Sequence, residues 1–223
     1  MSTPQYRVVE MTEAEVETER TVLGGLAQSI RLLNEASLRT TIAPEEVAAI
    51  RTEVDRLTEK LSREQIPGAF GVSFTPDGTV RGHGNAVVGL RNPIAVPLQI
   101  HKDGHGHATA EFHLGALYEG PPGCVHGGVL ALLLDQVLGE SAADGGSPGM
   151  TGTLTLRYVR PTPLGDCSIE AWVDHVEGIK TIVRGEFRRD DGSTTVEVEG
   201  IFILPKWARE AMSEEEHRPP RFE

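Results

Sequence analysis

Two glycines at the start of an apolar segment, followed by one carboxylate, could support acyl-transfer chemistry. Gly127 and Gly128 precede six apolar residues, and Asp135 comes directly after them. A helix start leaves backbone N–H groups unpaired and carries partial positive charge, so it can hold an anion or a developing oxyanion. An Asp inside an apolar helix is costly to bury unless it has partners or a chemical role. The pattern favours hydrolysis or acyl transfer; the alternative is that Asp135 forms a buried ion pair or caps a neighbouring element.

The spacing of this motif also predicts a dimer. His126 stands directly before the two glycines, and Asp135 follows nine positions after it. On one helix these residues would lie about 13 Å apart along the axis and on opposite faces. One helix therefore cannot direct both at the same substrate atom, whereas two antiparallel copies can. We infer a two-fold dimer with two shared sites.

Composition bounds the class of protein. The chain has 223 residues, of which 39% are hydrophobic and 24% charged, as in ordinary globular proteins. A formal net charge of −12 argues against nucleic acid as a partner. No run approaches the roughly 18 apolar residues of a membrane span. The acidic start lacks an apolar signal core, and Cys124 and Cys167 are too few for a disulfide framework or a zinc cluster, so we expect a cytoplasmic protein without metal or cofactor.

The elements before the motif fall into a helical part and a broken strand region. Residues 1–66 are expected to be helical, with a second helix starting at Pro44 and the part ending at Pro67-Gly68. Its apolar stripes predict an amphipathic hairpin that packs on the core or on a partner chain, or a lid over an apolar ligand. The strands expected next are Ala69–Thr75, Pro97–Asp103 and Ala108–Leu114. Four histidines of this region match no zinc spacing and are interpreted as surface residues: His101, His105, His107 and His113.

The elements from the motif onward predict an α+β fold. A helix over residues 126–143 is apolar nearly all round and should be buried. Alternating segments then predict antiparallel strands, and a curved sheet wrapped around the one helix accommodates them. We expect a helical extension over residues 1–66, this domain over 67–205 and a tail over 206–223. The strands are expected at Thr151–Arg160, Ser168–Val176, Lys180–Arg189 and Thr194–Leu204.

About half the chain, from Gly89 to Leu204, resembles a known enzyme family. The most specific residues are 118–123 with Val125-His126-Gly127-Gly128 and Asp135, continued by Met150-Thr151, residues 158–161 and residues 176–178. This pattern is similar to the hotdog-fold acyl-CoA thioesterases of the PaaI-like superfamily, in the branch acting on medium- and long-chain acyl-CoAs. The resemblance implies an antiparallel sheet around a central helix, a homodimer or dimer of dimers, and hydrolysis of acyl-CoA to a fatty acid and CoA.

The resemblance also implies roles for individual residues. The backbone N–H groups of Gly127 and Gly128 polarise the thioester carbonyl, and Asp135 acts as general base on water or as the nucleophile. Thr151 orients Asp135 or the water, and His126 positions the thioester end of the substrate. Many relatives carry Asn six residues before this His, where the present chain has Gly120. No role is carried over for that position.

The phosphates of CoA would require basic residues on this acidic chain. We expect Arg160 and Lys180 to bind the nucleotide end; the alternative is that they form surface salt bridges on the sheet. Two other functions stay open beside hydrolysis. One is a hotdog dehydratase acting on hydroxyacyl thioesters. The other is an acyl-CoA sensor or scaffold without turnover, whose helical extension serves as the output surface.

Overall fold

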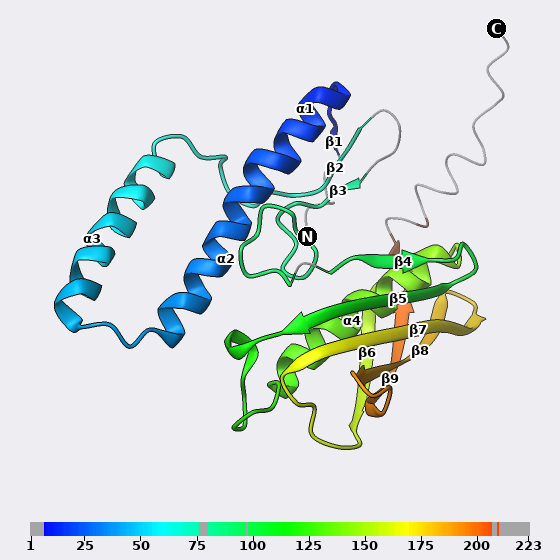
Figure 1. Ribbon diagram of the computed structural model, residues 1–223. Helices are drawn as coiled ribbons and strands as arrows, with labels where there is room; N and C mark the ends of the chain where they lie inside the picture. Colours follow the sequence, from blue (N-terminus) through cyan, green and yellow to red (C-terminus); the bar gives the residue numbers. More distant parts are fainter. Residues whose placement is uncertain (1–6, 76–79, 97, 207–208, 210–223) are drawn as a thin grey trace, which may run out of the picture. The chain divides into compact units, whose positions relative to one another are not determined.

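The computed structural model describes residues 7–75, 80–96, 98–206 and 209, which form two compact units (Figure 1). The first unit holds the described residues up to Val96, and the second those from Leu98 onward. The helices of the first unit end at Leu61, and the unit continues to Val96. The predicted tail lies outside the described residues except at positions 206 and 209.

The first unit combines helices with a small sheet. A Thr12 capping box starts the first helix. Pro44 occupies the first turn of the last helix, as the sequence predicts. The helical prediction for residues 1–66 is wrong at β1, which pairs with β2 in a three-stranded sheet of order β1-β2-β3. The elements are β1 (Arg7–Val8), α1 (Glu13–Thr18), the π-helical η1 (Glu19–Leu23), α2 (Gly24–Arg39), α3 (Pro44–Leu61), β2 (Ser73–Phe74) and β3 (Val80–Arg81).

The strand predicted over Ala69–Thr75 is reduced to the two residues of β2. Gly71 adopts a φ of 74°, in the left-handed region that a continuous strand does not tolerate. The turn at Gly68, with a φ of 71°, lies just before it. Positive φ angles at two nearby glycines therefore explain why the expected strand is so short.

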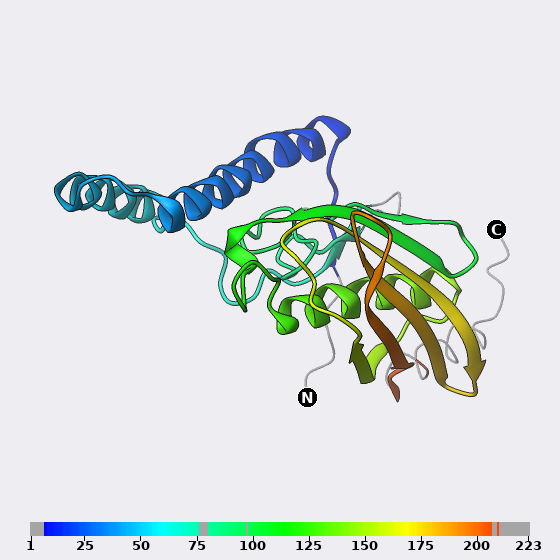
Figure 2. The ribbon, with the colours of Figure 1, turned by 60° about the horizontal axis from the view of Figure 1, so that its bottom comes forward.

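The second unit is a six-stranded antiparallel sheet that curves around one helix, α4 (Figure 2). The strand order is β4-β5-β7-β8-β9-β6, so β4 and β6 are the two edges. This is the hotdog arrangement that the sequence predicts. Its elements are β4 (Ile100–Lys102), β5 (His107–Leu114), the 3-10 turn η2 (Ala116–Tyr118), α4 (Gly127–Asp144), β6 (Met150–Tyr158), β7 (Gly165–Glu177), β8 (Lys180–Arg189) and β9 (Thr194–Ile203).

Helix α4 is the centre of the core because it is apolar on most of its surface. Leu133, Leu134, Val137 and Leu138 are fully buried. On the strands, roughly every second side chain is buried against the helix. This alternation is the pattern expected of a sheet with one buried face. Burial of such side chains contributes about 1.5–3 kcal/mol each. The fully buried strand residues include Ala108, Leu114, Ala171, Val183, Phe187 and Val196.

The C-terminal end of α4 is tied to the turn between β4 and β5. The Ser141 hydroxyl donates to the Gly106 carbonyl at 2.6 Å. The Asp144 carboxylate accepts the N–H groups of Gly104 and Gly106 at 2.9 and 3.0 Å. These bonds fix the axial position of the helix and, through it, the position of its N-terminus. None of the helices that the structure describes is long and apolar enough to cross a membrane.

Candidate functional site

A tight loop delivers the chain to the start of α4. The Gly120 N–H donates to the Cys124 carbonyl at 2.9 Å, and the Cys124 N–H donates to the Pro121 carbonyl at 2.8 Å. The carboxylate of Glu119 accepts the Gly123 N–H at 2.7 Å. Glu119 therefore closes the loop, a role that the sequence leaves unassigned.

Gly120 lies against His126 so closely that no side chain fits. A Cβ at position 120 would lie 2.7 Å from the His126 Cα and 3.0 Å from its Cβ. The His126 N–H donates to the Tyr118 carbonyl at 2.9 Å, and this bond holds the two sides of the loop together. The glycine found where many relatives carry Asn is thus a packing requirement of this loop.

His126 is the N-cap of α4 and satisfies most of the helix start itself. Its Nδ1 accepts the Gly128 N–H at 3.0 Å, so the ring proton of the neutral imidazole is on Nε2. Its carbonyl accepts the N–H groups of Val129 at 2.9 Å and Leu130 at 3.3 Å. Within the described part of the chain, the Gly127 N–H is the first-turn donor left without an acceptor. The predicted pair of donors is therefore reduced to one in this arrangement.

Tyr158, at the end of β6, also contacts the helix start. Its hydroxyl donates to the Gly127 carbonyl at 2.9 Å. A Cβ at position 127 would lie 3.4 Å from three atoms of this side chain, so the ring packs directly on the glycine. Local sequence patterns assign no role to Tyr158. The available signal was strand alternation, which places Tyr158 on the same face as Leu154 and Leu156.

Asp135 is half-buried in the middle of α4. The Thr151 hydroxyl donates to its Oδ1 at 2.8 Å, so the structure brings this predicted pair together. The other carboxylate oxygen has no hydrogen-bond partner among the residues that are described. By helix rise, Asp135 lies about 12 Å along the axis from Gly127. Donor and carboxylate of a single copy therefore do not meet at one substrate atom.

The two predicted phosphate-binding residues lie at opposite ends of the sheet. The Arg160 N–H donates to the Thr195 carbonyl, whereas Lys180 is in register with Ile203 on the same strand, β9. At 3.3 Å per residue, these ends are about 26 Å apart. Both side chains are exposed. One copy does not bring Arg160 and Lys180 to the same phosphate group.

Neighbouring arginines of the sheet form surface ion pairs instead. Arg157 lies 3.2 Å from Glu197. Arg184 lies 3.6 Å from Asp174 and 3.5 Å from Glu199. Exposed pairs of this kind contribute only about 0–1 kcal/mol.

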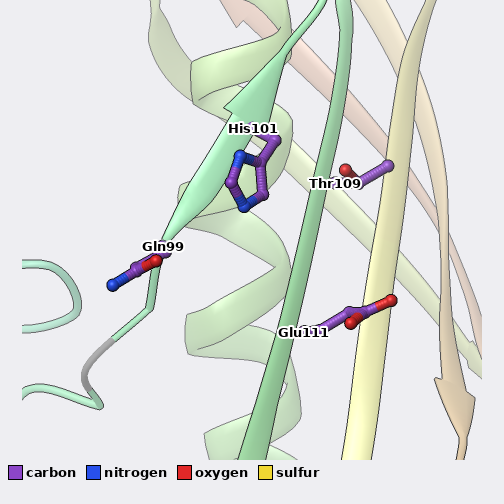
Figure 3. A pocket seen from close by; sticks show the side chains of 4 residues that line it. All are labelled: Gln99, His101, Thr109 and Glu111. Carbon is purple, nitrogen blue, oxygen red and sulfur yellow. The ribbon is translucent and has the colours of Figure 1, made fainter.

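A polar pocket of about 400 Å³ lies between β4 and β5, away from all predicted site residues (Figure 3). Its lining comprises Gln99, His101, Thr109 and Glu111. The apolar lining typical of an acyl-chain site is missing from this set, so the pocket does not suit an acyl chain. Across the residues with a described placement, no cluster of three or more His, Cys, Asp or Glu side chains could hold a metal ion.

Two histidines of the region pair with acids of β7. His107 Nε2 lies 2.9 Å from Glu170, and His113 Nδ1 lies 2.7 Å from Asp166. The pKa of Glu170 is lowered by its bond with His107 against the effect of burial, with Arg188 adding to the decrease. His107 and His113 therefore form surface pairs with acidic residues of the neighbouring strand.

Two comparisons with known proteins point to one family. Residues 122–196 match the sequence model of the thioesterase superfamily. The crystal structure of a thioesterase superfamily protein aligns with a TM-score of 0.73 and 33% identity, covering 82% of this chain and 90% of that protein.

Curated relatives match a smaller share. Acyl-coenzyme A thioesterase THEM4 of Xenopus laevis is 36% identical over 94 residues, which are 41% of this chain and 42% of that protein. MIOREX complex component 3 of Saccharomyces cerevisiae is 27% identical over 164 residues, which are 70% of this chain and 57% of that protein. The chain thus matches about two fifths of the length of the THEM4 relative.

Proposed function

The chain belongs to the thioesterase superfamily, and from this we propose that it hydrolyses acyl-CoA thioesters to a free acid and CoA. The observation that carries the proposal is on α4. This helix presents an unpaired backbone N–H at Gly127 and, further along, a carboxylate at Asp135 that keeps one oxygen free. A donor for an oxyanion and a base for water are the two groups that thioester hydrolysis needs.

The reaction follows from these two groups. The Gly127 N–H binds the thioester carbonyl oxygen and stabilises the negative charge that develops on it. Asp135 takes a proton from a water molecule whose oxygen attacks the carbonyl carbon. The C–S bond of the tetrahedral intermediate then breaks, and the CoA sulfur leaves with a proton. In the alternative, Asp135 itself attacks the carbonyl carbon, and water hydrolyses the resulting anhydride.

The site requires two copies of the chain. Because Gly127 and Asp135 are about 12 Å apart along one helix, we propose that Gly127 works with Asp135 of the partner subunit. The exposed edge strand β6 supports pairing between copies, since no described strand pairs with its outer edge. A homodimer, or a dimer of dimers, is the assembly that we expect.

Finer points of the substrate are part of the proposal. We expect medium- or long-chain acyl groups, with His126 positioning the thioester. Arg160 and Lys180 remain candidates for the nucleotide end, with each serving a different site. If Arg160→Ala leaves the KM for acyl-CoA unchanged, Arg160 has no such role. We also retain the helical extension over residues 1–66, the domain over 67–205, the tail over 206–223 and a cytoplasmic location.

The decisive test is release of free thiol from acyl-CoAs of short, medium, long and aryl type. Wild type and Asp135→Asn are measured side by side, with product analysis for enoyl thioesters. Thiol release that is lost in the variant supports hydrolysis and gives the chain preference. Formation of an enoyl thioester instead identifies a dehydratase.

A non-catalytic sensor or scaffold is the second candidate, and α3 is the observation that favours it. This helix has no buried residue, and Val47, Ile50 and Leu57 along its apolar stripe are exposed. Such a face could serve as an output surface for a protein that binds acyl-CoA without turnover. Binding of acyl-CoA with no thiol release from any substrate would support this reading.

A further inference from the structure

Tyr158 has no part in the proposed chemistry, yet it contacts the start of α4 directly. Its hydroxyl donates to the Gly127 carbonyl at 2.9 Å, and its ring packs on the same glycine. A carbonyl oxygen has two lone pairs, so this bond is compatible with the bond that the helix itself makes. Tyr158 is 53% exposed, which is high for a residue whose only role is to fill a core.

Tyr158 and His126 hold the two ends of one peptide group. The Gly127 carbonyl and the Gly128 N–H belong to the same planar unit. Tyr158 donates to its oxygen, and His126 Nδ1 accepts its N–H at 3.0 Å. Glycine is a poor helix former and helix ends fray, so two consecutive glycines need such a restraint to stay in place.

We infer that Tyr158 is a positioning residue that fixes the direction of the Gly127 N–H toward the substrate carbonyl. The inference rests on the proposed function, because it assigns that N–H as the oxyanion donor. The Gly127 N–H belongs to the preceding peptide group, and its nitrogen is bonded to the Cα at which the restrained peptide begins. Holding this peptide therefore restrains the donor, and donors must be held closely to stabilise an oxyanion. Tyr158 keeps its own proton throughout.

Strand β6 thereby positions both reacting groups of α4. Thr151, near the start of the strand, holds Asp135 at 2.8 Å, and Tyr158, at its end, holds Gly127. The same strand is a free edge of the sheet. Geometry at the helix start and geometry at the carboxylate are thus set by one element.

The first test is Tyr158→Phe, which removes the hydroxyl and keeps the ring. We expect kcat for acyl-CoA hydrolysis to fall about fivefold to tenfold, the size associated with one hydrogen bond, with KM nearly unchanged. The pH profile of kcat should keep its shape, because Tyr158 transfers no proton. Thr155→Val removes an exposed hydroxyl from the same strand and should match wild type. Equal kcat in wild type and Tyr158→Phe, or loss of one limb of the pH profile, would overturn the inference.

The second test measures how strongly the Gly127 N–H polarises the substrate carbonyl, and it does not depend on turnover. Dodecanoyl-CoA is bound to Asp135→Asn, and the Raman band of its thioester carbonyl is recorded. Adding Tyr158→Phe should move this band toward its position in free dodecanoyl-CoA, whereas adding Thr155→Val should leave it in place. An unmoved band overturns the inference. If wild type releases no thiol but the band moves as expected, the proposed function fails and the positioning role stands.

Discussion

Asp135 and Glu19 are helix carboxylates with opposite surroundings. Asp135, in the sheet-and-helix unit, accepts one hydroxyl from Thr151 and keeps its second oxygen free among the described residues. Glu19, in the π-helical turn of the first unit, has a side chain only 10% exposed and is paired with Arg81. His83 Nδ1 lies 3.4 Å and Arg91 3.7 Å from its other oxygen.

The difference separates a carboxylate that is available for chemistry from one that supports the fold. Burial alone would raise the pKa of Glu19, but its bond with Arg81 and the surrounding positive charge lower it. Burial is the main cause that lowers the pKa of His83, and Arg81 makes the direct ion pair with Glu19. Both oxygens of Glu19 thus face basic side chains. Asp135 keeps one oxygen without a hydrogen-bond partner among the described residues, and it is part of the helix whose start offers a donor.

Asp135→Asn gives the largest expected effect, because it removes the base and keeps the shape. Turnover of acyl-CoA should fall by about 10²–10⁴-fold, the range associated with a positioned acid or base. The free energy of unfolding should change little, since the Thr151 hydroxyl can still donate to the amide oxygen. Thiol release and urea unfolding of the same preparation measure both. Retained turnover would remove Asp135 from the chemistry.

Glu19→Gln should show the reverse pattern. Removing the charge leaves Arg81 without its ion-pair partner in a buried setting, and we expect a loss of about 3 kcal/mol in the free energy of unfolding. The kcat should stay at the wild-type value. Glu17→Gln is the matched control, because Glu17 is 65% exposed and its pair with Arg20 contributes little. Similar losses in both variants would contradict a special role for Glu19.

The sequence predicted the Asp135 region closely because its signals are local. The His-Gly-Gly motif and the apolar run predict a helix over 126–143, and α4 spans 127–144. The strand predicted over Lys180–Arg189 is observed with the same bounds. Turn signals at Glu177-Gly178 and at residues 190–192 fix these ends, and side-chain alternation fixes the face. The hotdog fold follows from these elements and the buried helix.

The Glu19 region shows what local patterns miss. Its partners Arg81 and His83 lie more than 60 residues away in the sequence, so no spacing rule connects them. The same holds for the bond from Tyr158 to Gly127, which depends on the register between a strand and a helix. The hydrogen bond from the Gly128 N–H to His126 Nδ1 could not be predicted from the sequence either. It depends on the rotamer of the His126 side chain rather than on residue type.

Thr151→Val should reduce turnover less than Asp135→Asn does. The base remains, but the bond that orients Oδ1 at 2.8 Å is lost, and we expect kcat to fall roughly tenfold. Thr155→Val serves as control, since it makes the same change on the same strand. A loss as large as that of Asp135→Asn would mean that Thr151 takes part in the chemistry itself and does more than orient the base.

Acidification should lower the stability that Glu19 and His83 contribute to the first unit. The folded-state pKa values of His83 and Glu19 are both below their ordinary values of 6.5 and 4.5. Protons therefore bind the unfolded chain more readily, and the stability contributed by each group is present above its ordinary pKa and lost as pH falls. We expect the free energy of unfolding to decline first below about pH 6.5, through His83, and again below about pH 4.5, through Glu19.

His83→Gln isolates the first of these steps. The variant keeps a polar side chain but cannot titrate, so its stability should be flatter than that of wild type between about pH 6.5 and 5. The remaining decline at lower pH should be weakened further in Glu19→Gln. Urea unfolding at a series of pH values measures both slopes. An unchanged slope in His83→Gln would mean that titration of His83 does not limit the acid stability of this unit.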